Sequence, residues 1–344
     1  MKRIQLMIIL LISVGALSAT TINVPDDAAT IQAGINVAID GDSVLVSSGT
    51  YIENVNFNGK NIVVYSTDGA DLTTIDGGGL GSVVTFSSQE NNAILDGFTI
   101  TNGRGILNDD NHFIGGGILC RYQSSPTLRN LIVEGNFTTG DTSMGGGIMC
   151  SYESDALIED VIIRENAADY GGGFLAYQSS PTLRRVEVHH NNGRTTGGGI
   201  ALWDSSAYLQ DVTIHHNTVE YLGAGLWAHD HATPVLNKVT IADNNCTSPI
   251  PSLRGGGGIE LSDGASLKLV NSNLWRNTPN QIEFYSGATY DDSRLDVDYS
   301  DIQNGELGIE TNDAGDLFYG SYNIMDDPLF GPNYTLTWGS PCID

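Results

Sequence analysis

The sequence has few positive charges for its size. Only 15 lysine and arginine residues stand against 41 aspartate and glutamate residues, and the formal charge is −26 at pH 7. A surface of this sign repels the phosphates of nucleic acids and anionic membranes. We therefore expect no nucleic acid partner, and a strongly anionic polysaccharide is mildly disfavoured as well.

Long apolar runs are also scarce. The one at the N-terminus, residues 4–17, follows Lys2 and Arg3 and is followed by the small residues Ser18 and Ala19. It is shorter than the roughly 20 residues that a membrane span requires, and no later segment could span. The pattern is typical of a secretory signal peptide over residues 1–19. We therefore expect an exported protein, secreted or held at the cell surface, with no membrane span.

Glycine, in contrast, is abundant and periodic. Six glycine blocks each end in an apolar residue, and these residues recur after 30, 26, 26, 26 and 33 positions: Ile118, Ile148, Phe174, Ile200, Leu226 and Ile259. Each block is followed by a tetrad that ends in asparagine: Asn136, Asn166, Asn191, Asn217, Asn244 and Asn277. Repetition at a period of this length indicates a repeat architecture.

The repeat predicts an all-β fold, a right-handed single-stranded parallel β-helix with about 26 residues per coil. That length accommodates three strands of about five residues and three turns. Glycine suits a tight corner, and asparagine can stack into an amide ladder. The glycine density and the alternation at residues 211–215 exclude helical repeats. The longer repeats should form loops near residues 137–144 and 246–255.

The predicted organisation is a single domain over residues 20–344, after the signal peptide. Residues 28–39 carry an amphipathic helical pattern, with Asp27 as a possible N-cap and Gly41 as the stop. A solenoid needs a cap on its open apolar end, and this helix fits that role. Regular coils are expected over residues 95–304, and a closing segment over residues 305–344.

Two of the four cysteines should lie side by side. Cys120 and Cys150 both follow the apolar residue of their glycine block by two positions, so both should face inward in adjacent coils, about 4.8 Å apart. This spacing permits a disulfide, and a stack of buried free thiols is equally compatible with it. For Cys246 and Cys342, which are far apart in sequence, the sequence predicts neither pairing nor its absence.

Several motifs resemble known β-helix proteins. Residues 30–36, Gly41-Asp42 and residues 49–51 look like the N-terminal signature of the pectin-lyase-like superfamily. The glycine blocks with their asparagine tetrads are similar to repeats of chlamydial polymorphic outer-membrane proteins. Residues 327–344 resemble the end of β-helix domains in large secreted bacterial proteins. In such relatives the chain continues into a sorting or anchoring module, so this chain is expected to be part of a longer one.

The resemblance implies the fold and leaves the reaction open, because this fold hosts enzymes, adhesins and inert scaffolds. The residue sets of pectinesterases, polygalacturonases and mannuronan epimerases are absent. Asp109-Asp110 occurs, but without its polygalacturonase companions. These absences lower the expectation of catalysis.

One face of the predicted helix carries outward aromatic residues in successive coils. Flat apolar rings with nearby hydroxyl groups can stack on sugar rings, although aromatic residues can also pack beneath a loop. The expected ligand-binding residues are Arg121, Tyr122, Tyr152, Tyr177, Trp203 and Trp227.

Asp204, Asp230 and Asp263 occupy the same offset in three coils. Stacked carboxylates repel one another, which raises a pKa or favours a cation. The functional readings are a Ca²⁺ site or a catalytic acid–base pair, and the structural reading is that aspartate is common in turns. His229 and His231 flank Asp230 and could act as base or proton donor, with Arg121 or Ca²⁺ as the stabiliser of an enolate.

A second pair of positions, His189-His190 and His215-His216, repeats after 26 residues. The outward histidines could hold a metal ion, but two imidazoles without a nearby carboxylate would make a weak site. The sequence thus favours a secreted or cell-surface protein that binds a polysaccharide or cell-surface glycan. A polysaccharide lyase or glycoside hydrolase is the alternative, and an adhesin or scaffold fragment is a third possibility.

Overall fold

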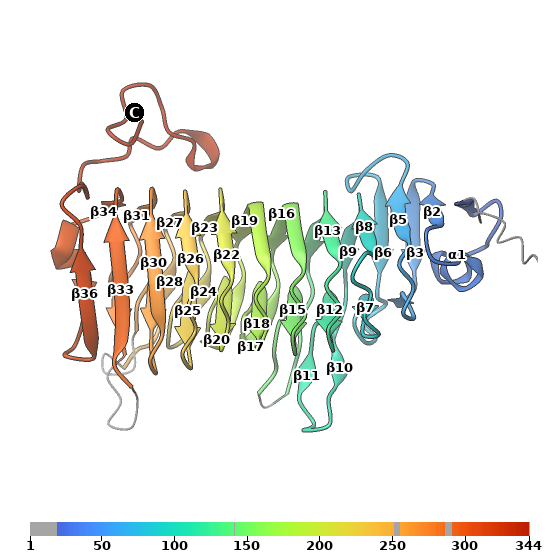
Figure 1. Cartoon of the computed structure of the whole chain (residues 1–344), viewed down its shortest axis with the longest axis horizontal. Coiled ribbons are helices and arrows are strands. Elements are labelled where there is room, and N and C mark those ends of the chain that lie inside the picture. The colour runs from blue at the N-terminus through green and yellow to red at the C-terminus, as the bar shows by residue number, and fades with distance from the viewer. Residues whose placement is uncertain (1–18, 141, 251–254, 286–290, 344) are drawn as a thin grey trace, which may run out of the picture.

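The computed structural model describes residues 19–140, 142–250, 255–285 and 291–343, which form one elongated solenoid (Figure 1). The predicted signal peptide, apart from Ala19, lies outside these residues. Within them, no helix is long and apolar enough to cross a membrane. Parallel strands stack coil upon coil along the long axis, which confirms the predicted all-β parallel solenoid.

The glycine blocks lead into a ten-stranded parallel sheet. Its strands are β4 (Val55–Asn56), β7 (Val84–Phe86), β12 (Ile118–Arg121), β15 (Ile148–Ser151), β18 (Phe174–Tyr177), β21 (Ile200–Trp203), β25 (Leu226–His229), β29 (Ile259–Leu261), β32 (Ile282–Phe284) and β35 (Ile309–Glu310). Ile148 lies opposite Phe174, and Phe174 lies opposite Ile200. Equal offsets in the repeat are therefore neighbours across strands, as the period predicts.

The rest of each coil contributes to a twenty-stranded sheet. Its strands are β1 (Thr21–Val24), β2 (Ser43–Val46), β3 (Gly49–Ile52), β5 (Val63–Ser66), β6 (Thr73–Asp76), β8 (Ile94–Asp96), β9 (Thr99–Thr101), β13 (Thr127–Arg129), β14 (Ile132–Glu134), β16 (Leu157–Arg164), β19 (Thr182–His189), β22 (Tyr208–Gln210), β23 (Thr213–His215), β26 (Val235–Asn237), β27 (Thr240–Ala242), β30 (Ser266–Val270), β31 (Asn273–Trp275), β33 (Ser293–Asp298), β34 (Asp301–Ile302) and β36 (Gly315–Tyr319).

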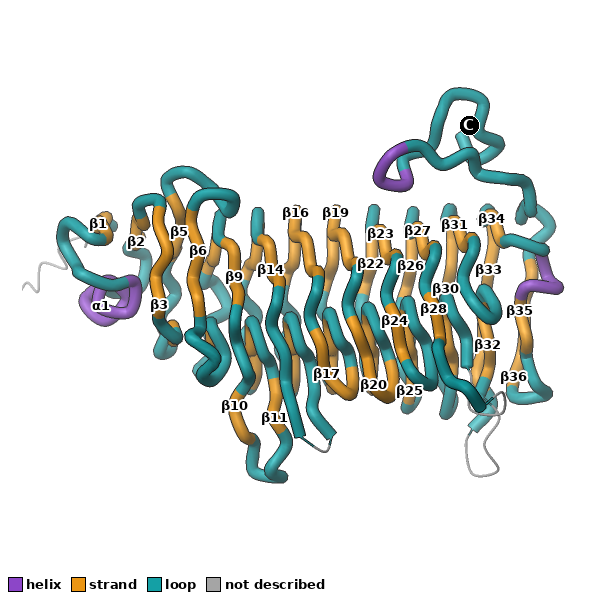
Figure 2. The backbone as a smooth tube through the Cα atoms, turned by 180° about the vertical axis from the view of Figure 1, so that it is seen from behind, coloured by secondary structure: helices purple, strands orange, loops and turns teal. Residues whose placement is uncertain are grey.

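Shorter elements complete the coils. Four strands that follow the asparagines form a small third sheet: β17 (Ala167–Tyr170), β20 (Asn192–Thr196), β24 (Thr218–Val219) and β28 (Asn245–Cys246). A hairpin of β10 (Ile106–Leu107) and β11 (Phe113–Ile114) projects beyond the coils (Figure 2). Two 3-10 turns span Gly305–Gly308 and Pro332–Tyr334. The loop predicted near 137–144 lies between Phe137 and Met144, which form isolated β-bridges with Ala167 and Tyr170. The loop predicted near 246–255 lies partly outside the described residues.

The interior is one continuous apolar core of buried side chains such as Phe57, Phe86 and Phe174. Cys120 and Cys150 lie in register within this core, and both are free thiols. Of the two predicted arrangements, the stack of buried thiols is therefore the one observed. Burial raises the pKa of the Cys120 thiol well above its usual value, which keeps it protonated and unreactive.

The glycine corners leave no space for a side chain. Gly171 has φ +65°, a conformation that residues with a Cβ rarely adopt, and a Cβ on Gly172 would lie 2.3 Å from the backbone oxygen of Asn192. The predicted requirement for glycine at this corner is confirmed, because the backbones of successive coils approach closely there.

The helix α1 (Ile31–Val37) closes the N-terminal end of the core, where Ile31 and Ile35 are fully buried. It is shorter than the predicted 28–39, and its N-cap is Thr30, whose hydroxyl accepts a hydrogen bond from the Ala33 N–H at 3.0 Å. Asp27 is not the cap. Its carboxylate accepts instead from the Asn23 backbone N–H at 2.9 Å, which fixes the turn before the helix.

The coils continue past residue 304, because β36 pairs with β33 and β35 pairs with β32. Ile324 still forms a parallel bridge with Asp301. Residues 325–343, the C-terminal segment, leave the solenoid. This segment turns back beside the coils that precede it in the chain (Figures 1 and 2).

The six asparagines form a buried ladder, as predicted. Asn191 illustrates it: its amide nitrogen donates to the Ile163 carbonyl at 2.9 Å and to Asn217 Oδ1 at 3.0 Å. Its own Oδ1 accepts from the backbone and side-chain nitrogens of Asn166 at 3.0 and 3.1 Å. Each amide thus satisfies backbone groups of its neighbours inside the stack.

We predict that Asn191→Ala destabilises the fold, because it leaves buried backbone groups of Asn166 and Ile163 without partners. Each such group costs about 1–3 kcal/mol. Urea denaturation of the variant and of Asn192→Ala measures the effect. Asn192 is exposed, and its amide bonds only Thr218 Oγ1, so its replacement should have little effect. Equal stability of the two variants would contradict the role of the ladder.

Candidate functional site

An aromatic row runs along the outward face of the ten-stranded sheet, at the ends of β12 to β25. Ring centroids of adjacent members lie 5.4–5.7 Å apart in the order Tyr122, Tyr152, Tyr177, Trp203 and His229. Tyr122 and Tyr152 are 47% and 40% exposed. The strand register brings these side chains together, as the sequence predicted.

A polar row lies beside the aromatic row, at the turns that follow the same strands. Gln89 donates to Gln123 Oε1 at 3.2 Å, and Gln123 donates to Glu153 Oε2 at 2.8 Å. One coil further, Gln178 donates to Asp204 Oδ2 at 3.4 Å. The polar row consists of these five residues, and side-chain amides and carboxylates alternate along much of it.

The two rows border a shallow cavity of about 700 Å³ that spans several coils. Tyr122 and Tyr152 line it from the aromatic row, and Glu153, Gln178 and Asp204 line it from the polar row. We call this cavity the aromatic groove. It offers flat apolar rings on one side and hydrogen-bonding groups on the other, the combination that recognises polyhydroxylated rings.

Trp227 does not belong to this surface, contrary to the prediction. It is only 4% exposed and packs in a second apolar cluster with Leu119, Met149 and Leu175, against Tyr170 and other side chains. The outward residue directly after each glycine block lies under the segment that leads into the block. Trp227 therefore packs beneath this segment, which is the alternative that the sequence left open for outward aromatic residues.

Trp203 is half-buried in the aromatic row and does not line the groove. Its indole N–H donates to Asp230 Oδ2 at 3.1 Å. Burial opposes ionisation of Asp230, but hydrogen bonds from His231 and Trp203 outweigh it and lower the pKa of this carboxyl. Asp230 is therefore an anion that orients the indole, and it is poorly suited to act as a general acid.

Asp204, Asp230 and Asp263 occupy successive coils on one side of the molecule, as the repeat predicted. All three have positive φ, from 48° to 53°, so they serve as turn residues. Their carboxylates contact separate partners, and no group of three His, Cys, Asp or Glu side chains that could hold a metal ion forms within the described residues. The Ca²⁺ hypothesis draws no support from this geometry.

The two histidines beside Asp230 have opposite electrostatic environments. His231 is exposed, with Nδ1 3.3 Å from Asp230 and Nε2 3.2 Å from Asp291, and these hydrogen bonds raise its pKa. Burial lowers the pKa of His229, whose Nδ1 lies 3.0 Å from Ser262 Oγ. Only His229 is thus favoured as a neutral base, and its ring stacks on buried Trp227 at 4.7 Å.

Arg121 lies at the far end of the aromatic row from the aspartates, on β12, while Asp230 follows β25. Its guanidinium packs over the Tyr122 ring at 4.8 Å. Arg121 thus supports the Tyr122 ring and does not itself line the groove. The structure does not place it where it could stabilise an enolate beside Asp230, as the catalytic hypothesis required.

A row of glutamates at the C-terminal end was not singled out by the sequence. Glu260, Glu283 and Glu310 continue the offset of Trp227 in successive strands. Glu260 is fully buried, and one of its oxygens accepts the Gly256 N–H. Burial and the neighbouring Glu283 raise the pKa of Glu260 well above its usual value. The sequence could have indicated this row, because the three glutamates share the offset of Trp227. It could not have indicated that Glu260 is buried.

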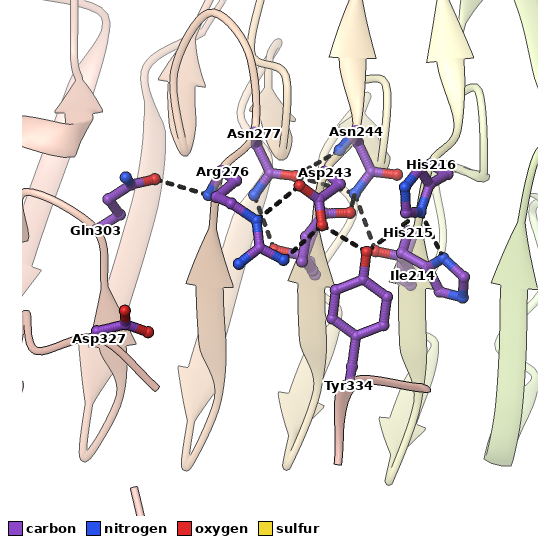
Figure 3. Close-up of polar contacts among 12 residues, drawn as sticks. Ile214, His215, His216, Asp243, Asn244, Arg276, Asn277, Gln303, Asp327 and Tyr334 are labelled. Carbon is purple, nitrogen blue, oxygen red and sulfur yellow. Dashed lines mark hydrogen bonds and ion pairs between the residues drawn. The ribbon is translucent and has the colours of Figure 1, made fainter. Parts of the chain in front are cut away.

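The paired histidines stack as expected, with His189 and His215 ring centroids 4.9 Å apart. The absence of a carboxylate, however, was wrongly inferred: His215 Nε2 lies 2.9 Å from Glu187 Oε1. Tyr334 from the C-terminal segment also covers His215 and His216 (Figure 3). This part of the surface is therefore an intramolecular contact.

We predict that Glu260→Gln stabilises the protein more at pH 8 than at pH 5.5. Since its pKa is raised in the folded state, Glu260 favours folding at low pH, and this contribution is lost as the pH rises above the usual pKa of the unfolded chain. Glutamine keeps the shape and does not titrate. Urea denaturation at both pH values measures the difference, with exposed Glu306→Gln as the control. An equal change at both pH values would count against a buried neutral carboxyl.

Comparisons with known proteins agree with the architecture. A family model described as the right handed beta helix region matches residues 34–219 and 170–297. None of the curated proteins matches the chain. Among solved structures, a pectin methylesterase from carrot aligns with a TM-score of 0.43 and 12% identity over 90% of each chain, a likeness too weak to inform function. The family matches together cover most of the sequence, and the chain therefore belongs to the right-handed β-helix family.

Proposed function

We propose that this protein binds a polysaccharide or cell-surface glycan along the aromatic groove. The observation that carries the proposal is the continuous aromatic row beside a polar row on one face of the solenoid. Because coils repeat at one strand spacing, about 4.8 Å, the groove presents similar groups several times along its length. A repetitive, extended ligand fits such a surface better than a compact one.

The two exposed tyrosines supply the strongest contacts. Tyr122 and Tyr152 are stacked nearly parallel, with an interplanar angle of 16°, and their exposed faces can carry the apolar face of a sugar ring. Gln123 and Glu153 lie next to them in the chain and can exchange hydrogen bonds with sugar hydroxyls. The stretch from β12 to β18 is therefore the proposed centre of the binding surface.

The charge of the groove favours a neutral glycan. Glu153, Asp155 and Asp204 line it, and none of them forms an ion pair within the described part of the chain. These carboxylates would repel a polymer of uronic acids, unless cations screened or bridged the charges. The signal-peptide pattern supports binding outside the cell, by a secreted or surface-attached protein.

We predict that Tyr122→Ala and Tyr152→Ala each weaken glycan binding about tenfold or more, since each removes a stacking surface from the groove. Affinity electrophoresis through gels that contain xylan, β-glucan, mannan or polygalacturonate measures the change. Phe318→Ala is the matched control, because Phe318 is equally exposed, at 48%, and lies on β36, away from the groove. Equal retention of all variants would refute binding at the groove.

We predict binding without turnover, because Asp230, Asp263 and His229 are engaged by protein groups and Arg121 lies far from them. Incubation with the same polysaccharides should release no new reducing ends and no unsaturated uronate chromophore. A product that disappears in His229→Ala would instead establish the lyase or hydrolase alternative. Adding and chelating Ca²⁺ in parallel tests whether a cation contributes.

A further inference from the structure

A second cavity lies beneath the C-terminal segment, against the twenty-stranded sheet. It has a volume of about 550 Å³, within the range of small-ligand sites. Lys238, Asn271 and Tyr299 line it on the solenoid side, and Leu336 and Cys342 line it from the C-terminal segment. The cavity forms because the C-terminal segment is held over strands that precede it in the chain.

The solenoid wall of this cavity is a column of turn residues. Within each coil the twenty-stranded sheet bends at a residue with positive φ, and three such residues line the cavity in successive coils: Lys238, Asn271 and Tyr299, at 56°, 52° and 50°. The backbone N–H of Lys238 donates to the Val270 carbonyl, which keeps the column in register. Side chains at the bend point outward and lie one above the other.

The C-terminal segment forms the roof of this cavity, and specific contacts hold it against the coils. The Tyr334 hydroxyl donates to Asp243 Oδ2 at 2.5 Å and lies 3.2 Å from His216 Nδ1 (Figure 3). Its ring packs against His215, with centroids 4.6 Å apart. Beyond Tyr334, the Cys342 thiol lies 3.3 Å from Asp301 Oδ2. The cavity is therefore a built feature of the fold, anchored on either side of Leu336.

The walls of the cavity combine two stacked tyrosine rings with polar side chains. Tyr299 and Tyr322 stack face to face, with centroids 4.8 Å apart and an angle of 4°, and remain 57% and 64% exposed. Because Tyr322 covers one face of Tyr299, the other face is turned towards the preceding coil and Asn271. The side-chain amide of Asn273 also lines the space, whereas the Ser272 hydroxyl is occupied by the Val270 carbonyl and the Val239 N–H.

We propose that this cavity binds one pyranose ring of a small neutral saccharide, stacked on the face of Tyr299 that is turned away from Tyr322. A ring there lies among the side-chain amides of Asn271 and Asn273, which can bond its hydroxyls. Lys238 and Asp301 bring opposite charges to the lining, so no net charge is required of the ligand. This site is on a different sheet from the aromatic groove and does not depend on it.

The test uses cellobiose, chitobiose, lactose and maltose as probes, titrated into the full chain by isothermal calorimetry. We expect at least one to bind the native protein, and Tyr299→Asn to raise its Kd at least tenfold. Asparagine tolerates the positive φ at this position, so the fold should persist. Phe318→Ala removes an exposed aromatic ring that lines neither this cavity nor the aromatic groove, and as the control it should leave this Kd unchanged.

A second readout separates the cavity from a merely structural tyrosine. Because the ligand contacts both wall and roof, the probe should slow protease cleavage of the C-terminal segment in the native protein and not in Tyr299→Asn. Tyr334→Phe, which removes only the hydroxyl that ties the roof down, should accelerate cleavage and raise the Kd. The proposal is overturned if none of the four saccharides binds, or if binding survives Tyr299→Asn unchanged.

Discussion

The whole molecule depends on one constraint, the stacking of each coil on the next at the spacing of adjacent parallel strands. The asparagine ladder enforces this spacing, because an amide such as that of Asn191 satisfies buried backbone groups of the preceding coil and bonds the asparagine side chain of the next coil. Glycine permits this spacing where the backbones of successive coils come close together, because a Cβ there would collide with the backbone of the next coil. Residues at equal offsets become neighbours as a consequence, and every row of side chains described above follows from that.

The same constraint explains why so much of the fold could be predicted from the sequence. A period of 26 residues fixes the register, and the register alone places Tyr122 beside Tyr152 and Asp204 beside Asp230. Helix α1 was predicted from the amphipathic pattern of residues 28–39, and its role followed from the need to cover the apolar end of the first coil. Its N-cap was misplaced because Asp27 and Thr30 are both good caps, and only the geometry of the preceding turn decides between them.

What the repeat could not predict is which outward residues are covered. Trp203 and Trp227 both point away from the core, yet Trp203 is only half-buried and Trp227 is buried beneath the segment around Tyr170. The difference depends on loop conformation, which has no period. Glu260 shows the same limit, because its offset was visible while its burial, and therefore its raised pKa, required the neighbouring coil and loop. Contacts such as Tyr334 with His216, 118 positions apart in the chain, leave no periodic trace at all.

Periodic and non-periodic parts of the chain also differ in the sites they can build. Repetition gives an elongated surface with similar groups in each coil, which suits a polymer and offers little discrimination among its units. The C-terminal segment breaks the repetition, because it brings Leu336 and Cys342 over a column that would otherwise be open. An enclosed site for a single ring can arise only at such a place. A chain that carries both kinds of surface can hold a long ligand along one face and recognise a small one at the other.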